Sequence, residues 1–528
     1  MPHTLVDTLV LKLTALLDKI GATADNHLWL GYSGGMDSEL LAYTLARFGE
    51  THPKTPYQIS LVHVHHGLSC NADAWAAHCR QRAEHYGLNF VLRKVQLELG
   101  PRVSIEAEAR RARYQAIAEL LNPGDILLTA HHQDDQLETL LLALKRGQGP
   151  KGLAAMGQAQ HLALISKAES SLAQTSRAES APCWQLRPML DSSRAQIEQA
   201  VASLELPYIN DESNQDTQYD RNFLRAEVIP VLKQRWPSIA TTASRSAALC
   251  AEQQLLLDEV SAEKLQPLLG RCRFSGVRVL DSAGLKVLSP QWQAQLLRQF
   301  IQMQRLPLPA QVQLQQALAQ LLDAREDAQL ELSFKGLLLR RYGQQIYAMA
   351  PLPGAAFQLL DSAGANEDVA ARLSKLTLSQ KQLQALSQGQ SLSVGLTSPW
   401  QRLELTLADS GPRVALAQVM APQLASLMAS IPASQRTKVQ PSDVAAAPEL
   451  VMGLKGSYRC QPHNRDKGRE LKKLWHELGV PPWLRDRVPL LMQNGRLLAL
   501  AGGFVERSAL ASGAEPGIVL KLVAEATP

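Results

Sequence analysis

A glycine-containing segment, Ser33-Gly34-Gly35-Met36-Asp37-Ser38, follows an apolar run and has the residue types of a phosphate-binding loop. Adjacent glycines let the backbone approach a polyanion, and a helix that starts there directs free N–H groups toward it. Ser33 and Ser38 add hydroxyl donors. The carboxylate of Asp37 would repel phosphates, but a magnesium ion bridging it to them would remove the repulsion. The alternative for this segment is a tight turn with a helix cap.

Two further pairs of side chains lie at spacings that place them on shared helix faces. Asp135 and Glu138 are three residues apart in a predicted helix, and paired carboxylates at such a place suit a cationic amino acid. Arg110 and Arg113 are also three apart and can bind phosphates or the nucleotide. A solvated helix face is the alternative for the two arginines.

Histidines gather near the ends of two predicted strands: His63, His65, His66, His131 and His132. A metal cluster is one alternative, because imidazole is a common metal ligand. We disfavour it because no thiolates assist these histidines, and the cysteines of the chain form no C-x-x-C pair. His131 is predicted to position a substrate, whereas His63 is predicted to be a packed core residue.

The elements that hold these residues alternate between strand and helix. Four apolar runs are predicted strands, and a helix follows each of them: strands 28–31, 58–63, 90–95 and 125–130, helices 39–48, 75–86, 106–121 and 133–145. This alternation predicts an α/β fold with a doubly wound parallel sheet, in which ligands bind beyond the carboxyl ends of the strands. The glycine loop and the segments 63–67 and 131–135 all lie at such ends.

The rest of the chain divides into segments of different character. Residues 158–182 are rich in Ser, Ala and Gln and are interpreted as a surface insertion. Residues 237–322 are predicted to be helical, 327–349 to form a hairpin, 430–448 to be a linker and 469–478 to form a helix. We expect four parts: an α/β domain (1–225), a helical domain (226–350), a variable region with a linker (351–448) and an α+β C-terminal domain (449–528).

The composition fits a globular protein of several domains. The chain has 528 residues, 45% of them hydrophobic and 20% charged, and this length predicts about three or four domains. The first residues lack the basic start and unbroken apolar core of a signal peptide, and no run is long enough to span a bilayer. Six scattered cysteines indicate reduced thiols. These features predict a cytoplasmic protein without a membrane partner.

A basic segment lies near the C-terminus. Between Lys455 and Arg496, ten Lys or Arg residues stand against four Asp or Glu, a local charge of +6 compared with +5 for the whole chain. A neutral body with one basic end is common in proteins that bind nucleic acid, and a solvated helix face is the alternative. The candidates for binding an RNA backbone are Lys472, Lys473, Arg485 and Arg487. Trp475 and Trp483 are predicted to be core residues.

Further segments complete a pattern with the loop at 33–38. They include His63-Val64-His65-His66-Gly67-Leu68, Glu106-Ala107-Glu108-Ala109-Arg110, His131-His132-Gln133-Asp134-Asp135, Tyr219-Asp220-Arg221-Asn222 and Val480-Pro481-Pro482-Trp483. Together they resemble the N-type ATP pyrophosphatases, or PP-loop enzymes, and within them the tRNA(Ile)-lysidine synthetases. The resemblance covers most of residues 25–350 and 450–510.

The resemblance implies a two-step reaction on tRNA(Ile) with a CAU anticodon. ATP, with Mg²⁺, adenylates O2 of the wobble cytidine and releases pyrophosphate. The ε-amine of free L-lysine then attacks C2 and expels AMP, which leaves lysidine. The helical domain and the C-terminal domain are accordingly expected to bind substrate and tRNA, and a homodimer is kept as a partner prediction.

The same resemblance assigns roles to the residues of the pattern. Asp37, with its magnesium ion, His131 and Arg221 are carried over as catalytic residues, with Arg225 as a further contributor to adenylation. The segment 33–38 with Arg110 and Arg113 is expected to bind ATP. Lysine recognition falls to Asp135 and Glu138. A neighbouring carboxylate raises the pKa of an ε-ammonium from about 10.4, which opposes its use as a nucleophile. Two interpretations stay open: the pair holds the α-amino group, or one carboxylate takes the ε-proton during attack.

Three rival functions remain at this point. A tRNA 2-thiolase of the same superfamily usually relies on paired cysteines, which the chain lacks. An amidating ligase would need an ammonia source, and no glutaminase domain is apparent. A catalytically inactive RNA-binding relative is disfavoured by the intact loop with Asp37.

Overall fold

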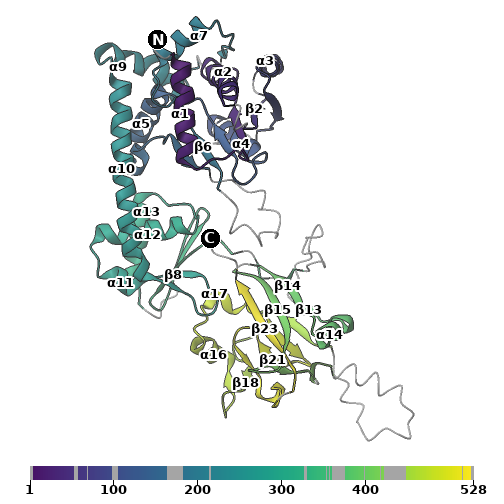
Figure 1. The fold of residues 1–528 in the computed structure, drawn as a ribbon. Coiled ribbons are helices and arrows are strands. Elements are labelled where there is room, and N and C mark those ends of the chain that lie inside the picture. The colour runs from purple at the N-terminus through teal and green to yellow at the C-terminus, as the bar shows by residue number, and fades with distance from the viewer. Residues whose placement is uncertain are drawn as a thin grey trace, which may run out of the picture. The chain divides into compact units, whose positions relative to one another are not determined.

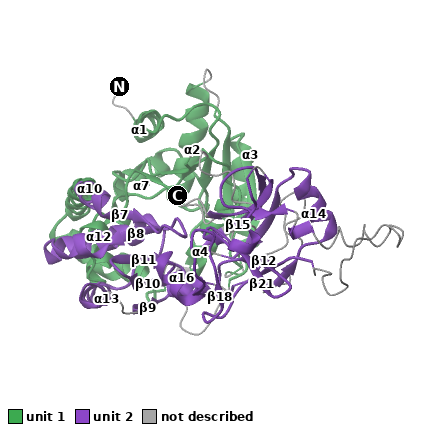
Figure 2. Ribbon diagram, turned by 90° about the horizontal axis from the view of Figure 1, so that it is seen from below, with its two compact units in different colours: residues 1–170, 174–259 green, residues 171–173, 260–528 purple. Residues whose placement is uncertain are grey.

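The structure is a computed structural model that describes most of the chain. The described residues are 4–52, 57–67, 69, 71–97, 105–162, 182–212, 216–325, 330–352, 354–355, 357–358, 375–397, 399–416, 418–420, 447–513 and 515–524. The chain forms two compact units, one of residues 1–170 with 174–259 and one of residues 171–173 with 260–528 (Figure 2). Among the described residues, no helix is long and apolar enough to cross a bilayer.

The first unit is built on a six-stranded sheet with the order β3-β2-β1-β4-β6-β5 (Figure 1). Its strands are β1 Leu28–Gly31, β2 Ile59–His65, β3 Asn89–Lys94, β4 Ile126–Leu128, β5 Ala159–His161 and β6 Trp184–Leu186. Five strands run parallel, with β1 between β2 and β4, and β5 runs antiparallel to β6 at one edge. The predicted doubly wound sheet is therefore confirmed, with an antiparallel edge strand that the sequence did not indicate.

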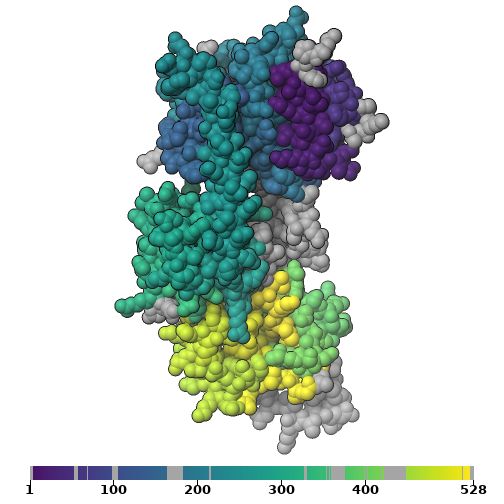
Figure 3. Space-filling view, turned by 60° about the vertical axis from the view of Figure 1, so that its left-hand side comes forward, coloured from purple at the N-terminus to yellow at the C-terminus, as the bar shows by residue number. Residues whose placement is uncertain are grey.

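Helices connect and cover these strands. They are α1 Leu5–Lys19, α2 Met36–Thr51, α3 Ala72–His85, α4 Ile105–Ala118, α5 Gln133–Lys145, α6 Pro150–Leu153, α7 Arg194–Ser203, α8 Asp220–Phe223, the π-helix η4 Leu224–Val228, α9 Ile229–Arg235 and α10 Ile239–Leu265. Part of the surface of α10 is visible on the face shown in Figure 3. The predicted helix 133–145 has the bounds of α5, and the other predicted helices of this unit differ from the observed ones by a few residues at their ends.

Successive residues of β1 point to opposite faces of the sheet, as the pleat of a strand requires. Leu28 and Leu30 belong to a buried core that includes Leu40 of α2 and side chains of α1 and α7. Trp29 belongs to a second core on the other face, together with Ile117 of α4. Helices thus cover both faces, and the carboxyl ends of the strands are left for the loops that carry the candidate site residues.

Two of the predicted segments lie mostly outside the described residues. The segment 158–182 begins with strand β5, and its residues 163–181 are not among those described. The predicted linker 430–448 is described only at 447–448.

The second unit begins with helices packed on a five-stranded antiparallel sheet of order β7-β8-β11-β10-β9. After α10 come η5 Gln266–Leu268, β7 Leu269–Arg271, β8 Arg278–Asp281, α11 Ser282–Lys286, α12 Pro290–Met303, α13 Gln311–Asp323, β9 Leu330–Phe334, β10 Leu337–Tyr342 and β11 Gln345–Met349. The prediction that 237–322 is helical throughout is wrong at β7 and β8. These strands are too short to show an alternating pattern, and β8 is held by its pairing with β11, far away in sequence.

The C-terminal part of this unit contains two more five-stranded sheets, with the orders β12-β14-β15-β23-β16 and β13-β17-β20-β21-β22. Its elements are β12 Phe357–Gln358, β13 Lys375–Thr377, α14 Gln380–Ser387, β14 Leu392–Leu396, β15 Trp400–Ala408, β16 Val414–Ala415, β17 Glu449–Val451, β18 Arg459–Cys460, β19 Arg469–Glu470, α16 Leu471–Glu477, α17 Pro482–Arg485, β20 Leu490–Gln493, β21 Arg496–Leu500, β22 Phe504–Val505, η8 Arg507–Ala509 and β23 Gly517–Ala524. One core joins them and includes Trp400 and Trp475, so the prediction that Trp475 is a core residue is confirmed.

Candidate functional site

The glycine loop runs from the end of β1 to the start of α2. Gly34 has a φ of +81°, and a Cβ there would lie 2.5 Å from Cδ1 of Ile209 and 2.8 Å from Sγ of Cys79. Both the backbone conformation and the available space therefore require glycine at this position. The hydroxyl groups of Ser33 and Ser38 lie 3.1 Å apart, and that of Ser38 also donates to the Gly35 carbonyl oxygen.

Asp37, in the first turn of α2, is paired with a cation that the sequence did not indicate. Nη1 of Arg194 lies 3.0 Å from Oδ1 of Asp37, and Nε2 of His132 lies 3.7 Å from Oδ2. Burial raises the pKa of Asp37, although His132 and Arg194 oppose the change. A signal for Arg194 exists in the sequence: the capping box of Ser193 and Gln196 places it in the first turn of α7. A cation is unfavourable there unless an anion lies nearby.

Asp135 and Glu138 lie together on α5, as their spacing predicts. Both accept hydrogen bonds from Arg225, with Nη2 2.8 Å from Oδ1 of Asp135 and Nε 2.5 Å from Oε1 of Glu138. The other oxygen of Asp135 accepts from the backbone N–H of His132 at 2.9 Å and so caps α5. Burial raises the pKa of Glu138, although Arg225 opposes it. Burial acts on Asp135 in the same sense, but His132, a second histidine and Arg225 outweigh it and lower the pKa of Asp135.

His131 follows β4 and faces several guanidinium groups. Its Nδ1 lies 2.9 Å from Oγ1 of Thr129. Burial lowers the pKa of His131 to about 3, and Arg187, Arg110 and Arg221 add to this effect while a carboxylate opposes it. An imidazole with such a pKa is neutral at neutral pH. It can orient a substrate through a hydrogen bond, but it cannot donate a proton as an imidazolium.

The remaining arginines predicted for the nucleotide site have separate partners. Arg110 stacks on the ring of Tyr114, with its Cζ 5.1 Å from the ring centroid. Arg113 donates from Nε to Nε2 of His66 at 3.4 Å. Nε of Arg221 lies 3.6 Å from a carboxylate oxygen of Glu106 on the same helix as Arg110. Arg221 and Arg225 therefore have different partners. Arg221 lies beside Glu106 of α4, and Arg225 binds Asp135 and Glu138 of α5.

The histidines do not form a metal centre in the part of the chain that the structure describes, where no group of three or more His, Cys, Asp or Glu side chains could hold a metal ion. His63 is buried, and its Nδ1 lies 2.9 Å from the carbonyl oxygen of Tyr32, so the prediction that it is a core residue is confirmed. A magnesium site requires fewer protein ligands than such a cluster provides, since one or two carboxylates and the substrate phosphates suffice. Asp37 offers one such carboxylate, and its present partner is itself a cation.

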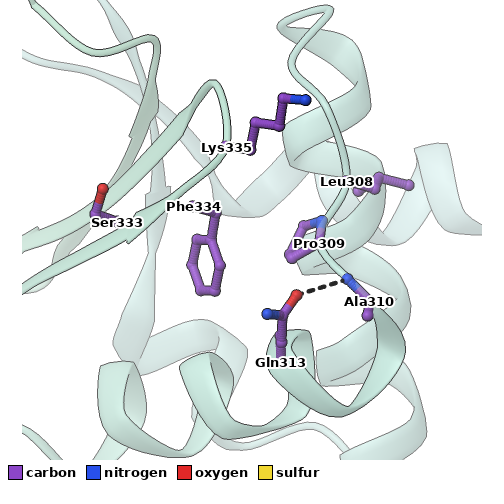
Figure 4. Close-up of a pocket in the computed structure, with 7 residues that line it drawn as sticks. All are labelled: Leu308, Pro309, Ala310, Gln313, Ser333, Phe334 and Lys335. Carbon is purple, nitrogen blue, oxygen red and sulfur yellow. Dashed lines mark hydrogen bonds between the residues drawn. The ribbon is translucent and has the colours of Figure 1, made fainter. Parts of the chain in front are cut away.

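The second unit contains a pocket of about 420 Å³ between the start of α13 and the turn from β9 to β10 (Figure 4). Phe334 and Pro309 form apolar walls, and Oε1 of Gln313 accepts from the backbone N–H of Ala310 at 3.1 Å. Lys335 is the charged side chain in its lining. The pocket has none of the carboxylates or histidines of the loop site, so the candidate catalytic residues lie in the first unit.

The four cations predicted to bind RNA lie in α16 and around α17. Lys472 and Lys473 are both exposed on α16. Arg485 donates from Nε to the carbonyl oxygen of Val480 at 3.2 Å, and burial lowers the pKa of Arg487. Trp483 is only partly buried, and its ring lies 5.1 Å from that of Tyr347, centroid to centroid. The two lysines thus remain available to a phosphate backbone, whereas Arg485 is partly engaged by the protein.

Comparisons with known proteins match most of the chain. Residues 6–232 match the family model of a PP-loop domain, residues 280–347 that of a TilS substrate binding domain, and residues 450–522 that of a TilS substrate C-terminal domain. The tRNA(Ile)-lysidine synthase of Shewanella oneidensis is 47% identical over 95% of this chain and 96% of that protein. The chain belongs to the tRNA(Ile)-lysidine synthase family.

Other members of the tRNA(Ile)-lysidine synthase family are similar over comparable lengths. The protein of Shewanella woodyi is 44% identical over 93% of this chain and 92% of its own, and that of Escherichia coli O157:H7 is 36% identical over 93% and 94%. Membership confirms the prediction of an ATP-dependent ligase with a PP-loop domain and decides against the thiolase and the inactive relative.

Proposed function

We propose that this member of the tRNA(Ile)-lysidine synthase family joins the ε-amine of free L-lysine to C2 of the wobble cytidine in tRNA(Ile) with a CAU anticodon. One observation carries the proposal. Nε2 of His132 lies 3.7 Å from a carboxylate oxygen of Asp37 and 3.6 Å from one of Asp135. A loop suited to phosphates and a carboxylate pair suited to an amine therefore belong to the same site.

The first step is adenylation of the base. The cytosine O2 attacks the α-phosphorus of ATP, and the bond to the β-phosphate oxygen breaks with release of pyrophosphate. The N–H groups at the start of α2 and the hydroxyl groups of Ser33 and Ser38 suit the charge of that leaving group. Asp37 would hold a magnesium ion, which would neutralise part of the phosphate charge when bound. Arg110, Arg113 and Arg221 are proposed to contact ATP and the adenylate.

The second step needs an amine without its proton. Its nitrogen attacks C2, AMP leaves with the O2 oxygen, and the nitrogen loses a proton. The environments of the two carboxylates separate their pKa values, with that of Asp135 lowered and that of Glu138 raised. We assign Asp135 to holding the cationic substrate as a carboxylate and Glu138 to accepting the proton, since a raised pKa makes the better base. His131, which is neutral, positions the base or the amine.

The tRNA body is proposed to bind to the second unit. The exposed Lys472 and Lys473, with Arg485 and Arg487, offer positive charge to the phosphate backbone. We place the enzyme in the cytoplasm because its tRNA substrate is there. The homodimer stays a prediction, which sedimentation of the purified chain would test.

A lysine-incorporation assay tests the function. The full chain is incubated with ATP, Mg²⁺, labelled lysine and a tRNA(Ile) transcript with a CAU anticodon, and the digested RNA is examined for lysidine. We expect label in the anticodon of this tRNA and none in elongator methionine tRNA, which has the same anticodon. Absence of incorporation, or equal incorporation into both tRNAs, would contradict the proposal.

A further inference from the structure

The cation that binds Asp135 and Glu138, the acidic pair of α5, is the guanidinium of a residue of this chain, Arg225. Arg225 donates to Oδ1 of Asp135 at 2.8 Å and to Oε1 of Glu138 at 2.5 Å. Each carboxylate thus gives one oxygen to the same guanidinium. A substrate ammonium that approaches these carboxylates must compete with a charge that is already paired.

The pair is nevertheless built to take a further donor. The side chain of Glu138 is only 1% exposed, and its Oε2 has no hydrogen-bond partner among the described residues. Oδ2 of Asp135 is occupied by the backbone N–H of His132. A buried carboxylate oxygen without a donor is costly, so the arrangement is incomplete with Arg225 alone.

Arg225 lies on a segment that can release it. Its side chain remains 43% exposed, so it can turn into solvent without opening the core. It belongs to the π-helix η4, and such irregular helical turns are frequent at functional sites. Leu224 and Ile229, on either side of it, pack into a small core with Leu137 of α5 and hold the segment in place while the guanidinium moves.

A competing anion for Arg225 is expected from the neighbouring loop. Arg225 binds the carboxylate of Asp135, and Nε2 of His132 lies 3.6 Å from that carboxylate and 3.7 Å from the carboxylate of Asp37 in the loop. The guanidinium is therefore within electrostatic range of the loop proposed to hold phosphates. A polyphosphate or an adenylated base bound there offers it a stronger anionic partner than one carboxylate.

We propose that Arg225 is an internal competitor of the amine substrate, which occupies Asp135 and Glu138 until nucleotide and tRNA at the loop draw its guanidinium away. This inference rests on the proposed function, because the amine is lysine. An ammonium that binds both carboxylates then requires release of Arg225, so lysine affinity is low before ATP and tRNA bind and rises with them. This favours adenylation before lysine attack, since the amine site becomes free only when ATP and tRNA are bound and the adenylated base can form.

Lysine binding to the full chain, measured by calorimetry without ATP or tRNA, tests the competition. We expect Arg225→Gln to bind lysine about tenfold more tightly than the wild type, since removing a competitor worth one ion pair shifts the equilibrium in this direction. Arg225→Lys, which can make fewer bonds to the two carboxylates, should lie between the wild type and Arg225→Gln. Adding α,β-methylene ATP with the tRNA transcript should raise lysine affinity in the wild type and leave Arg225→Gln unchanged.

The matched control is Lys145→Gln, which removes another cation that joins α5 to the segment before η4. Nζ of Lys145 lies 2.7 Å from Oδ1 of Asp220, and both side chains are at least half exposed. This ion pair does not involve the acidic pair of α5, so Lys145→Gln should bind lysine like the wild type. An equal increase in Lys145→Gln and Arg225→Gln would mean that loosening this segment, and not removal of the competing guanidinium, raises lysine affinity.

The outcomes separate this inference from the proposed function. Lysine binding by Arg225→Gln and Arg225→Lys that is no tighter than in the wild type would overturn the competition, provided Asp135→Asn still weakens lysine binding. Wild-type lysine binding and use in Asp135→Asn would instead remove the lysine site on which the proposed function depends. Should Arg225→Gln fail to fold, Arg225→Lys alone decides, because its expected increase is opposite to the loss that mere disruption would cause.

Discussion

At the scale of single residues, Asp37 combines two demands that conflict. It lies where phosphates are expected, yet it carries negative charge, and its pKa is raised by burial. Arg194 and His132 balance this charge in the structure. Substitution of Asp37 by Asn keeps the shape but removes the charge that a magnesium ion needs. We predict that the rate of tRNA-dependent pyrophosphate release falls by about 100-fold or more. The measurement is the rate at which AMP and pyrophosphate form in the presence of the tRNA.

The matched control for Asp37→Asn is Asp191→Asn, which removes an exposed carboxylate paired with Lys12. It should change the rate less than about twofold, because exposed ion pairs contribute little. Near-normal turnover of Asp37→Asn would show that the loop is not the site of pyrophosphate release.

Substitutions of the two carboxylates of α5 are predicted to affect different kinetic constants. Asp135→Asn should raise the KM for lysine, because a bound cation loses its ionised partner. Glu138→Gln should lower kcat for lysine transfer by about 10²–10⁴-fold, since a positioned base contributes about that much. Burial raises the pKa of Glu138 above its ordinary value. The rate of transfer in the wild type should therefore fall as pH drops through that raised pKa, and Glu138→Gln should lack this part of the profile.

Single-turnover lysine transfer to preadenylated tRNA, measured across pH, separates these effects from adenylation. An unchanged kcat in Glu138→Gln with a raised KM would mean that Glu138 binds lysine and that another group takes the proton.

The residue types and spacing predict which side chains meet but not how each is paired. Asp135 and Glu138 share a helix face because α5 is regular, which their spacing indicates. The capping box at the start of α7 marks Arg194 as a cation in need of an anion, but it does not identify Asp37 as the partner, because this contact joins residues 157 positions apart. The contact of Arg225 with the acidic pair was not predicted, since the π-helical turn at η4 breaks the simple relation between spacing and direction; its contribution to adenylation stays a prediction.

At the scale of elements, the start of α2 depends on one glycine conformation. Gly34 has φ +81° and no space for a Cβ beside Ile209 and Cys79, whereas Gly35 has φ −71° and only Ser33 Oγ within 3.4 Å. Gly34→Ala should lower the free energy of unfolding by about 1–3 kcal/mol and abolish ATP binding, because strain and a clash displace the loop. Gly35→Ala is the matched control, and urea unfolding with nucleotide titration compares the two. Equal effects of the two substitutions would contradict the conformational argument.

Behind this loop, a buried network fixes α2 to the elements beside it. Glu39 is fully buried and accepts from the hydroxyl of Tyr32, from Nε of Arg82 at 2.8 Å and from the hydroxyl of Tyr86 at 2.6 Å. A buried charge with this many donors stabilises one arrangement of β1, α2 and α3. No local pattern predicts this network, since a glutamate in the first turn of a helix is ordinary on the surface.

For the whole molecule, local patterns predict the α/β sheet better than the later sheets. Parallel strands buried on both faces are continuous apolar runs, as in β1 and β4, and each is followed by a helix. The strands β7 and β8 are too short to show alternation. The strand β15 pairs along its length with β23, and β13 pairs with β17, so segments predicted as 351–448 and 449–528 share two sheets. Strand pairings between segments so far apart in the sequence produce no local pattern from which they could be predicted.

Charge on the second unit is predicted to act on tRNA and not on ATP. Lys472 and Lys473 are exposed on α16, whose other face is anchored by Leu471, Leu474 and Trp475, so their substitution spares the core. Lys472→Glu with Lys473→Glu should raise the dissociation constant for tRNA(Ile). The slope of log affinity against log salt should become shallower by about one for each phosphate that these lysines neutralise in the wild type.

Filter binding of the tRNA over a range of salt, together with ATP titration, measures both effects of this double substitution. Lys381→Glu in α14, an exposed lysine outside the basic segment, is the control and should leave the salt slope unchanged. A double variant with normal tRNA affinity and slope would show that α16 is a solvated helix face, and tRNA contacts would then have to be sought on other surfaces. Weakened ATP binding in the same variant would instead indicate that the substitution disturbs the protein beyond this helix, because the loop that is proposed to bind ATP belongs to the other unit.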